Sequence, residues 1–480
     1  MRYTKAVQTT PTFLRRIPEP VWLVLATVGV GVLAGATTSL LPFWAGFLGL
    51  AVLAGATLVL SDVRLCAAAM FAIATILPFA TLPFRAVVTP SLLNLALLAF
   101  SALWLLQVLT TPGARLRLTP LGLPLLGFLG LTLFALLLGS GLNPGSQLLH
   151  SYFKFVCAVL VFFSITHLVT TDADARWLIR ALILSGGVSA LIGLVIYITP
   201  DDLALRLLVA LGRIGYPESG RVLRFVEDDT AGIERAIGLA VDPNSFGGML
   251  ALVGALAATQ LVAERPVIAR RWLAPIVGAI LLALFLTYSR AALAGMIVAA
   301  MYVATLRYRR LWWVILAAGA LAALLFTGLG VGEQFMVRIT EGVQFRDQAN
   351  QMRLAEFANA IAIIQAYPVF GIGFGSAPEL DLTAGVSSIY LAIAQRTGLV
   401  GLAAFLGLMA LFFGRSLRAL ATASASGAVE RASWLVSLQA AVASALTVGL
   451  LDHYFFNIEF SHMAALLWGV IGIATALEDQ

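Results

Sequence analysis

The chain has 480 residues, of which 60% are hydrophobic and only 11% are charged. A soluble globular protein carries about 25% charged residues, so this composition excludes that class and predicts an integral membrane protein with many spans. The formal net charge of +6 comes mostly from arginines in loops between apolar segments, so it reflects membrane topology and gives no sign of nucleic-acid binding.

Apolar windows long enough to cross a bilayer, about 20 residues each, recur along the whole chain. They predict spans at 21–38, 41–60, 64–82, 91–109, 121–139, 148–169, 176–199, 243–263, 272–287, 290–306, 311–330, 386–412, 433–451 and 459–477. Backbone in lipid must satisfy its own hydrogen bonds, so runs this long indicate helices. We predict an all-α polytopic membrane protein with about 12–14 transmembrane helices.

Short basic loops predict the orientation, because arginine and lysine favour the cytoplasmic side. The N-terminal segment 1–20 and alternate short loops carry most of the arginines, so they and both termini are expected to be cytoplasmic. The two larger loops, 200–242 and 331–385, then lie outside. Residues 21–480 are expected to form a single membrane domain. Cys66 and Cys157 fall inside predicted spans, so no disulfide framework is implied.

The first outer loop has mixed charges, which is typical of a solvated loop. It ends in ERAIGLAVDPNSFGG, where Asp242-Pro243-Asn244 predicts a turn and the start of the next helix, since proline suits the first helical turn.

The second outer loop carries apolar residues at helical spacing, from Leu354 to Ile364, interleaved with polar ones. We predict a helix there, lying along the outer interface. Pro368 ends it, and the glycines of GIGFG permit sharp backbone. No buried strand precedes these glycines, so a dinucleotide-binding loop is not indicated.

Three arginines sit on the outer side at the edges of spans. Arg235 precedes the Asp242 turn, Arg290 lies at a hairpin apex in TYSRAAL, and Arg353 opens the interfacial helix. One interpretation is interfacial snorkelling or ion pairing with Glu234 or Glu356. The other is a cationic pocket for a lipid-linked phosphate or pyrophosphate, because guanidinium groups bind phosphate with paired hydrogen bonds.

The order of these segments resembles the O-antigen ligase and O-antigen polymerase superfamily of bacterial envelope proteins. The resemblance rests on ERAIGLAVDPNSFGG, LTYSRAAL, an arginine before the interfacial helix, PVFGIGFG and IYLAIAQRTGLVG, and it covers about residues 234–401. It implies a GT-C-like helical bundle and a metal-independent, inverting glycosyltransferase without a cofactor. The implied donor is an undecaprenyl-pyrophosphate-linked glycan, the acceptor a glycan or lipid, and the location the outer face of the bacterial inner membrane.

The same resemblance implies that Arg290 and Arg353, with Arg235, bind the pyrophosphate. The chain departs from the family pattern at two places. Ser387-Ser388 stands where ligases commonly have His-Asn before the x-Tyr-Leu element, and Arg396 replaces a glutamate often seen before T-G-L-x-G. Ser387, Ser388 and Tyr390 remain candidates for the acceptor side of the site.

A replacement for the missing imidazole is suggested by LDHYFFNIEF, near the outer end of a predicted span. There Asp452 and His453 could supply a carboxylate and imidazole for proton transfer. A histidine at a span end is also compatible with a simple interfacial residue.

Two other functions stay open from the sequence. A small-solute transporter is suggested by the number of spans and by Ser185-Gly186-Gly187, which could break a helix, although we find no internal repeat. A non-catalytic relative that binds lipid-linked glycans is suggested by the missing histidine.

Overall fold

In the computed structural model, residues 55–82, 90–111, 117–226, 229–230, 232–328, 348–374 and 386–478 are described. Within these ranges the chain forms α-helices, short 3-10 helices and two isolated β-bridges. The helices, in chain order, are α3 (Val63–Ile76), α4 (Leu92–Thr110), α5 (Gly122–Gly139), α6 (Ser146–Leu168), α7 (Asp172–Ile198), α8 (Asp201–Ala210), α9 (Pro243–Val262), α10 (Arg270–Leu286), α11 (Arg290–Leu306), α12 (Leu311–Gly328), α14 (Gln348–Ala366), α15 (Ile389–Ala425), α16 (Val429–Val448) and α17 (Ser461–Glu478), and the 3-10 helices named below are η2 (Leu211–Ile214) and η4 (Tyr454–Phe456).

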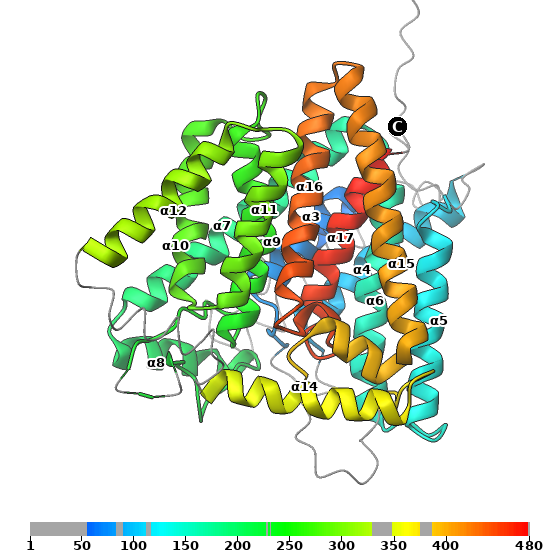
Figure 1. The fold of residues 1–480 in the computed structure, drawn as a ribbon. Helices are drawn as coiled ribbons and strands as arrows, with labels where there is room; N and C mark the ends of the chain where they lie inside the picture. The colour runs from blue at the N-terminus through cyan, green and yellow to red at the C-terminus, as the bar shows by residue number, and fades with distance from the viewer. Residues whose placement is uncertain are drawn as a thin grey trace, which may run out of the picture.

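Every predicted span from 64–82 onward corresponds to one of these helices, which confirms the all-α polytopic fold. Seven helices among the described residues are long and apolar enough to cross a membrane, and α3, α11 and part of α12 are shorter apolar helices. The predicted spans 21–38 and most of 41–60 lie outside the described residues. The helices run side by side as one bundle (Figure 1).

The centre of the bundle is formed by α9, α16 and α17. In α17 and α9, 94% and 83% of the apolar window is buried. Buried polar side chains join these helices, because in lipid an unpaired polar group has no water to bind. The Gln260 amide on α9 donates to Ser437 Oγ on α16 at 2.7 Å, and Gln439 of α16 donates to Ser416 Oγ of α15 at 2.8 Å.

The glycine pair in α7 does not break that helix, which is continuous from Asp172 to Ile198. A Cβ at Gly187 would lie 2.8 Å from the Ile276 side chain of α10, and one at Gly186 would meet Val253 of α9. The glycines therefore allow close helix packing. The helix break suggested at Ser185-Gly186-Gly187 is therefore wrong.

The segment 200–242 is more ordered than a solvated loop. It contains α8 and η2, and Leu208 packs with Val222 and Ile237 in a small apolar cluster. Asp201 and Asp202 lie in the first turn of α8, where acidic side chains complement the helix dipole. Counting charges alone missed Ala204 and Leu208, the two buried residues through which this short helix packs.

Helix α14 lies across one end of the bundle, as expected for an interfacial helix (Figure 1). We call this end the α14 end. Leu354 and Ile361 are exposed, whereas Ala360 and Ile363 are buried and Arg353 and Glu356 are half-buried. The charged side chains of α14 therefore face the bundle, and part of the predicted apolar series faces away from it.

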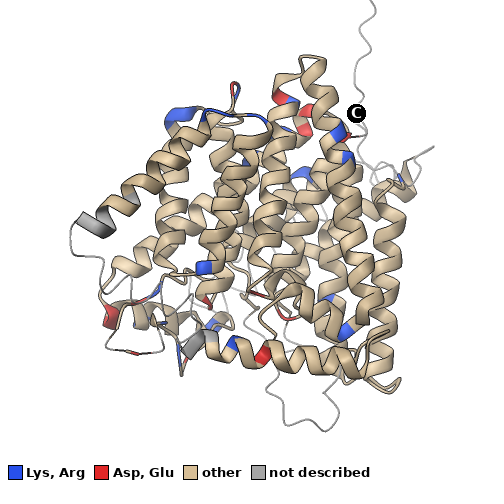
Figure 2. Cartoon of the chain, in the orientation of Figure 1, with Lys and Arg blue, Asp and Glu red and all other residues tan. Residues whose placement is uncertain are grey.

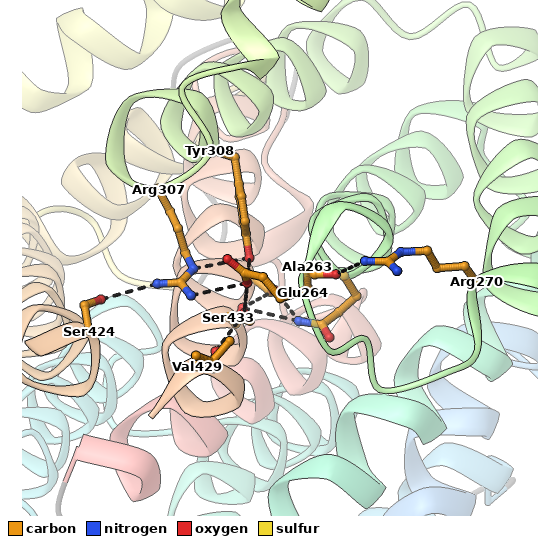
Figure 3. Close-up of polar contacts among 10 residues, drawn as sticks. Ala263, Glu264, Arg270, Arg307, Tyr308, Ser424, Val429 and Ser433 are labelled. Atoms are coloured by element: carbon orange, nitrogen blue, oxygen red, sulfur yellow. Dashed lines mark hydrogen bonds and ion pairs between the residues drawn. The ribbon is translucent and has the colours of Figure 1, made fainter. Parts of the chain in front are cut away.

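Charged residues concentrate at the two ends of the bundle (Figure 2). At the end opposite α14, a polar network joins the α9–α10 and α11–α12 connections to α16 (Figure 3). Glu264 Oε2 accepts from Arg307 at 3.3 Å and from the Tyr308 hydroxyl at 3.2 Å, and the Ser433 hydroxyl lies 3.1 Å from that of Tyr308. Arg307 also donates to Ser424 Oγ at 3.4 Å. This network ties the α9–α10 and α11–α12 connections to α16, and so helps to hold α9, α11 and α16 together at this end.

Helix α15 is broken near its start, at Gly398, where φ is 70° and ψ is −178°. The turn after α14 supplies the hydrogen bonds that the break removes. Ile372 N donates to Gln395 O and Gly373 N donates to Arg396 O, both at 2.9 Å, and Leu399 N donates to Pro368 O at 2.8 Å. The glycine-rich turn and the T-G-L segment are therefore two halves of one backbone joint.

Glycine is required at this joint for two reasons. The dihedral angles of Gly398 fall in a region that is essentially restricted to glycine. In addition, a Cβ at Gly398 would overlap the Val369 carbonyl, and one at Gly371 would overlap the Gln395 carbonyl. A Cβ at Gly139, at the end of α5, would lie 2.5 Å from the Ile372 carbonyl oxygen and 2.8 Å from Gly373 Cα. Helix α5 therefore also packs closely against this turn.

We expect Gly398→Ala to destabilise the protein by about 3 kcal/mol or more, since strained backbone and a clash with backbone atoms add together. Thermal unfolding of the purified protein in detergent measures the effect. Gly407→Ala in the same helix is the matched control, because a Cβ there meets no atom within 4 Å. That control should be neutral or stabilising, and equal melting temperatures for the two variants would contradict the prediction.

Candidate functional site

A cluster of charged side chains lies at the α14 end and joins three segments that are distant in sequence. They are the residues that lead into α9, the first turns of α14, and the connection between α16 and α17. Arg235 and Asp242 come from the first segment, Arg353 and Glu356 from α14, and Asp452 from the connection. We call these five residues, with His453, the charged cluster.

Asp242 begins α9 as the sequence predicts, with Pro243 in the first turn. Its Oδ1 accepts from the backbone N–H groups of Asn244 at 2.8 Å and Ser245 at 2.9 Å, so the carboxylate caps the helix. The same oxygen accepts from the Tyr454 hydroxyl at 2.8 Å. Asp242 thereby ties the start of α9 to the α16–α17 connection.

Arg235 links two helix ends. Its Nε donates to the carbonyl of Thr287, at the end of α10, at 2.7 Å, and its NH2 group donates to Asn244 Oδ1 at 2.6 Å. Burial lowers the pKa of Arg235, while the nearby carboxylates of Asp242 and Asp452 raise it. The guanidinium is held in place by these contacts and stays charged.

Arg353 and Asp452 form an ion pair, with 3.8 Å between a guanidinium nitrogen and Oδ1. The side chains are 17% and 5% exposed. Burial raises the pKa of Asp452 to about 7, against the opposing effect of Arg353. Oδ2 of Asp452 is buried and makes no hydrogen bond to a described residue. The pair is therefore a charged contact with one oxygen left for a further partner.

His453 stacks on the Tyr454 ring, with centroids 4.7 Å apart. Its Nδ1 is buried and has no hydrogen-bond partner within the described part of the chain. Burial lowers the pKa of His453, and Glu356 and Asp242 act in the opposite direction. The imidazole is thus neutral at pH 7 and retains a nitrogen that can accept a proton.

Glu356 receives two hydrogen bonds from one residue that is distant in sequence: the Ser387 backbone N–H donates at 3.0 Å, and the Ser387 hydroxyl donates as well. Ser388 and Tyr390 point elsewhere. The Ser388 hydroxyl donates to Gly449 O at 3.3 Å and the Tyr390 hydroxyl donates to Leu446 O at 3.0 Å, both at the end of α16. Of the three acceptor-side candidates, Ser387 alone contacts the charged cluster in these bonds.

Arg290 is the first residue of α11, and it is exposed. The hairpin between α10 and α11 is as tight as predicted, with Tyr288 at φ 52°. Arg290 comes three residues after Thr287, whose carbonyl accepts a hydrogen bond from Arg235. It therefore lies at the edge of the site, beside the Arg235 position.

The ion-pair partners suggested from the sequence need correction. Arg353 pairs with Asp452, not with Glu356, because both Arg353 and Glu356 turn toward the bundle and Glu356 is engaged by Ser387. Arg235 binds a carbonyl and an amide oxygen instead of Glu234. Exposed snorkelling side chains would not make these buried contacts.

Sequence reasoning missed Glu356, Asp242 and Tyr454 as members of the site. Glu356 and Asp242 were interpreted only as an ion-pair partner and a helix start. The i, i+3 spacing of Arg353 and Glu356 was a usable signal, since it places both on one face of a helix.

A fourth arginine, Arg396, lies just before the break in α15 and reaches the same region. Its guanidinium carbon is 5.2 Å from the centroid of the Phe374 ring. Phe374 in turn packs against Phe456 of η4, with centroids 6.3 Å apart. Arg396 is close enough to His453 to lower the pKa of the imidazole.

The arrangement has two chemical capacities. Fixed guanidinium groups can bind a phosphate and stabilise negative charge that develops on a leaving group. The Asp452 carboxyl, with a pKa of about 7, can take up a proton near neutral pH, and the neutral imidazole of His453 can accept a proton from a reacting hydroxyl.

Comparison with known families agrees with this geometry. Residues 275–406 match a family model described as O-antigen ligase, and the match supports the O-antigen ligase superfamily for this chain. It spans Arg290, Arg353, Ser387 and Arg396, whereas Arg235, Asp452 and His453 lie outside it. No curated protein matches the chain. The match indicates an O-antigen ligase-like glycan-transfer function in general terms.

Proposed function

We propose that this multi-pass membrane protein transfers or polymerises a glycan from an undecaprenyl-pyrophosphate-linked donor, on the outer face of the bacterial inner membrane. Residues 234–401 would supply the ligase-like core, and the α16–α17 connection would complete it. The observation that carries the proposal is the convergence of Arg235 and Arg353 with Asp452 and His453 beneath an interfacial helix.

In the proposed reaction, the oxygen of an acceptor hydroxyl forms a bond to the anomeric carbon of the donor glycan. The bond from that carbon to the pyrophosphate oxygen breaks, and the lipid pyrophosphate leaves with the electron pair. Attack from the opposite face inverts the anomeric configuration. The hydroxyl proton passes to His453, whose imidazolium would be stabilised by the carboxylates of Glu356 and Asp242.

Arg353, Arg235 and Arg290 would hold the pyrophosphate. Their charge is worth most when the leaving group gains negative charge, and the partial burial of Arg235 and Arg353 reduces the screening of that interaction by water. The proposed chemistry draws on guanidinium groups and calls on no metal or cofactor.

The outer location is supported by the distribution of basic residues. The α14 end carries the two large connections, and the opposite end carries basic loops such as Arg307 to Arg310. By the positive-inside rule, the end of the bundle that carries Arg307, opposite the α14 end, would be cytoplasmic, and so would both chain termini.

Reconstitution tests the proposal directly. Purified protein in liposomes, supplied with lipid-linked glycan extracted from its own membranes, should transfer or extend the glycan. Arg290→Ala should lower the rate about 10- to 100-fold, as loss of one exposed phosphate contact would. Arg310→Ala is the control and should keep full activity, because Arg310 lies in the α11–α12 turn, at the opposite end of α11 from Arg290.

Two outcomes would favour the other functions. Tight donor binding without transfer would identify a non-catalytic lipid-glycan binder. Uptake of a small solute into the liposomes, with neither binding nor transfer, would identify a transporter. The transporter interpretation has lost its supposed helix break, since Gly186 and Gly187 serve packing.

A further inference from the structure

Arg396 is a mostly buried cation, and it has no acidic partner among the described residues. Within this part of the chain, no carboxylate forms an ion pair with it and its side chain makes no hydrogen bond. Its guanidinium lies over the ring of Phe374 in a cation–π contact. The other buried arginines of this region differ, because Arg353 has Asp452 and Arg235 has two oxygen acceptors.

The surroundings of Arg396 are aromatic. Phe374 packs against Tyr152, with centroids 5.6 Å apart, and against Phe456. A buried charge is costly unless it is paired, and a ring face replaces only a small part of the lost hydration. The described residues supply no anion to the five N–H donors of this guanidinium, so these donors are available to an anion of a ligand.

Arg396 and the proposed pyrophosphate arginines reach the α16–α17 connection through different contacts. Arg353 pairs with Asp452. Arg396 lies over the ring of Phe374, and that ring packs against Phe456. His453 lies between Asp452 and Phe456 in the sequence, so both contacts end within three residues of it.

We propose that Arg396 binds a carboxylate or phosphate carried by the acceptor sugar, and so selects an anionic glycan. This inference rests on the proposed function, in which His453 takes the proton of the acceptor hydroxyl. In the proposed arrangement, the acceptor sugar turns its hydroxyl toward His453 and the donor pyrophosphate binds at Arg353. The acidic group of the acceptor then binds at Arg396. The fork of the guanidinium suits a two-oxygen anion.

Binding of defined sugars to the protein in nanodiscs tests this proposal. The probes are methyl glucuronide for the carboxylate, glucose 6-phosphate for the phosphate and methyl glucoside as the neutral control. Wild-type protein should bind at least one anionic probe about tenfold or more tightly than methyl glucoside, as expected for a charge-assisted hydrogen bond. The probe that binds more tightly identifies the anionic group.

Arg396→Gln should abolish this preference, and Arg396→Lys, which keeps the charge but loses the fork, should keep part of it. Arg418→Gln, an exposed arginine further along α15, is the control and should bind like wild type. No preference in wild type, or a preference that survives Arg396→Gln, would overturn the proposal. Equal melting temperatures show that the variants are folded.

Binding of undecaprenyl pyrophosphate separates this proposal from the proposed function. Arg353→Gln should weaken it strongly, and Arg396→Gln should leave it within about twofold. If Arg396→Gln weakens pyrophosphate binding as much as Arg353→Gln does, Arg396 belongs to the donor site and the acceptor proposal fails. If Arg353→Gln has no effect on it, the donor site itself is refuted, whatever Arg396 does with the sugars.

Discussion

Replacing Arg353 by alanine is expected to lower glycan transfer about 100- to 1000-fold, the loss typical when a fixed group that stabilises transition-state charge is removed. Arg353 is nearly buried and paired with Asp452, so its position is defined before the donor binds. Initial rates in the reconstituted liposome assay measure the effect. Arg353→Lys should recover only part of the rate, since a lysine cannot hold two phosphate oxygens with one planar group.

The fold of the Arg353→Ala variant must be checked at a suitable pH. Loss of the guanidinium leaves Asp452 buried alone, and its pKa, already about 7, rises further because Arg353 was lowering it. At pH 6 the carboxyl is then mostly protonated, so the variant should unfold at nearly the wild-type temperature. At pH 8 the same variant should be less stable, because a buried carboxyl with a raised pKa opposes folding once it must ionise.

The double variant Arg353→Ala/Asp452→Asn separates catalysis from charge balance. It removes both members of the ion pair and should be stable across this pH range but remain as slow as Arg353→Ala. Recovery of transfer in the double variant would contradict the prediction, since it would mean that Arg353 only neutralises Asp452.

His453→Gln is expected to lower the rate of transfer about 100- to 10,000-fold, the usual contribution of a positioned general base. Nδ1 of His453 lies in the charged cluster and has no hydrogen-bond partner among the described residues, and burial lowers the pKa of the ring. Donor binding, measured with undecaprenyl pyrophosphate, should change little in this variant. A variant that transfers glycan at more than a third of the wild-type rate would exclude His453 as the base.

The pH profile distinguishes His453 from Asp452. In wild type, the rate should fall as the pH drops through about 7, because Asp452 becomes protonated and its pairing with Arg353 is lost. A second fall should appear below the ordinary histidine pKa, as His453 is protonated. Asp452→Asn should remove the first fall and keep the second. The charges that face Asp452 are Arg353, Arg235, Asp242 and Glu356, all within the charged cluster.

The helical fold was predictable because each span is a long apolar run, and lipid leaves such a run no alternative to a helix. The Asp242 turn and the Tyr288 hairpin were also predictable, since proline and short spacing act locally. The pairing of Arg353 with Asp452 was not, because the two residues are 99 positions apart in the sequence and several carboxylates were possible partners. Tertiary packing decided which one.

The glycines near Pro368 show the same limit. Their spacing indicated an unusual backbone, but nothing in the sequence said that Gly371 and Gly398 would contact each other's segments. The hydrogen bonds between residues 368–373 and 395–400 explain why the two motifs occur together. Of the candidate site, the arginines were found from their positions at span edges, and the carboxylates that order them were missed.

The orientation of α14 has a consequence for how a lipid substrate would arrive. Its apolar side chains Leu354 and Ile361 face away from the bundle, and Arg353 and Glu356 face it. The charged face of α14 therefore lies between the helix and the end of the bundle, where the ion pair with Asp452 forms. Under the proposed function, a prenyl lipid whose tail stays in the hydrocarbon beside the bundle would bring its phosphates sideways along the interface to Arg353, without crossing the bilayer interior.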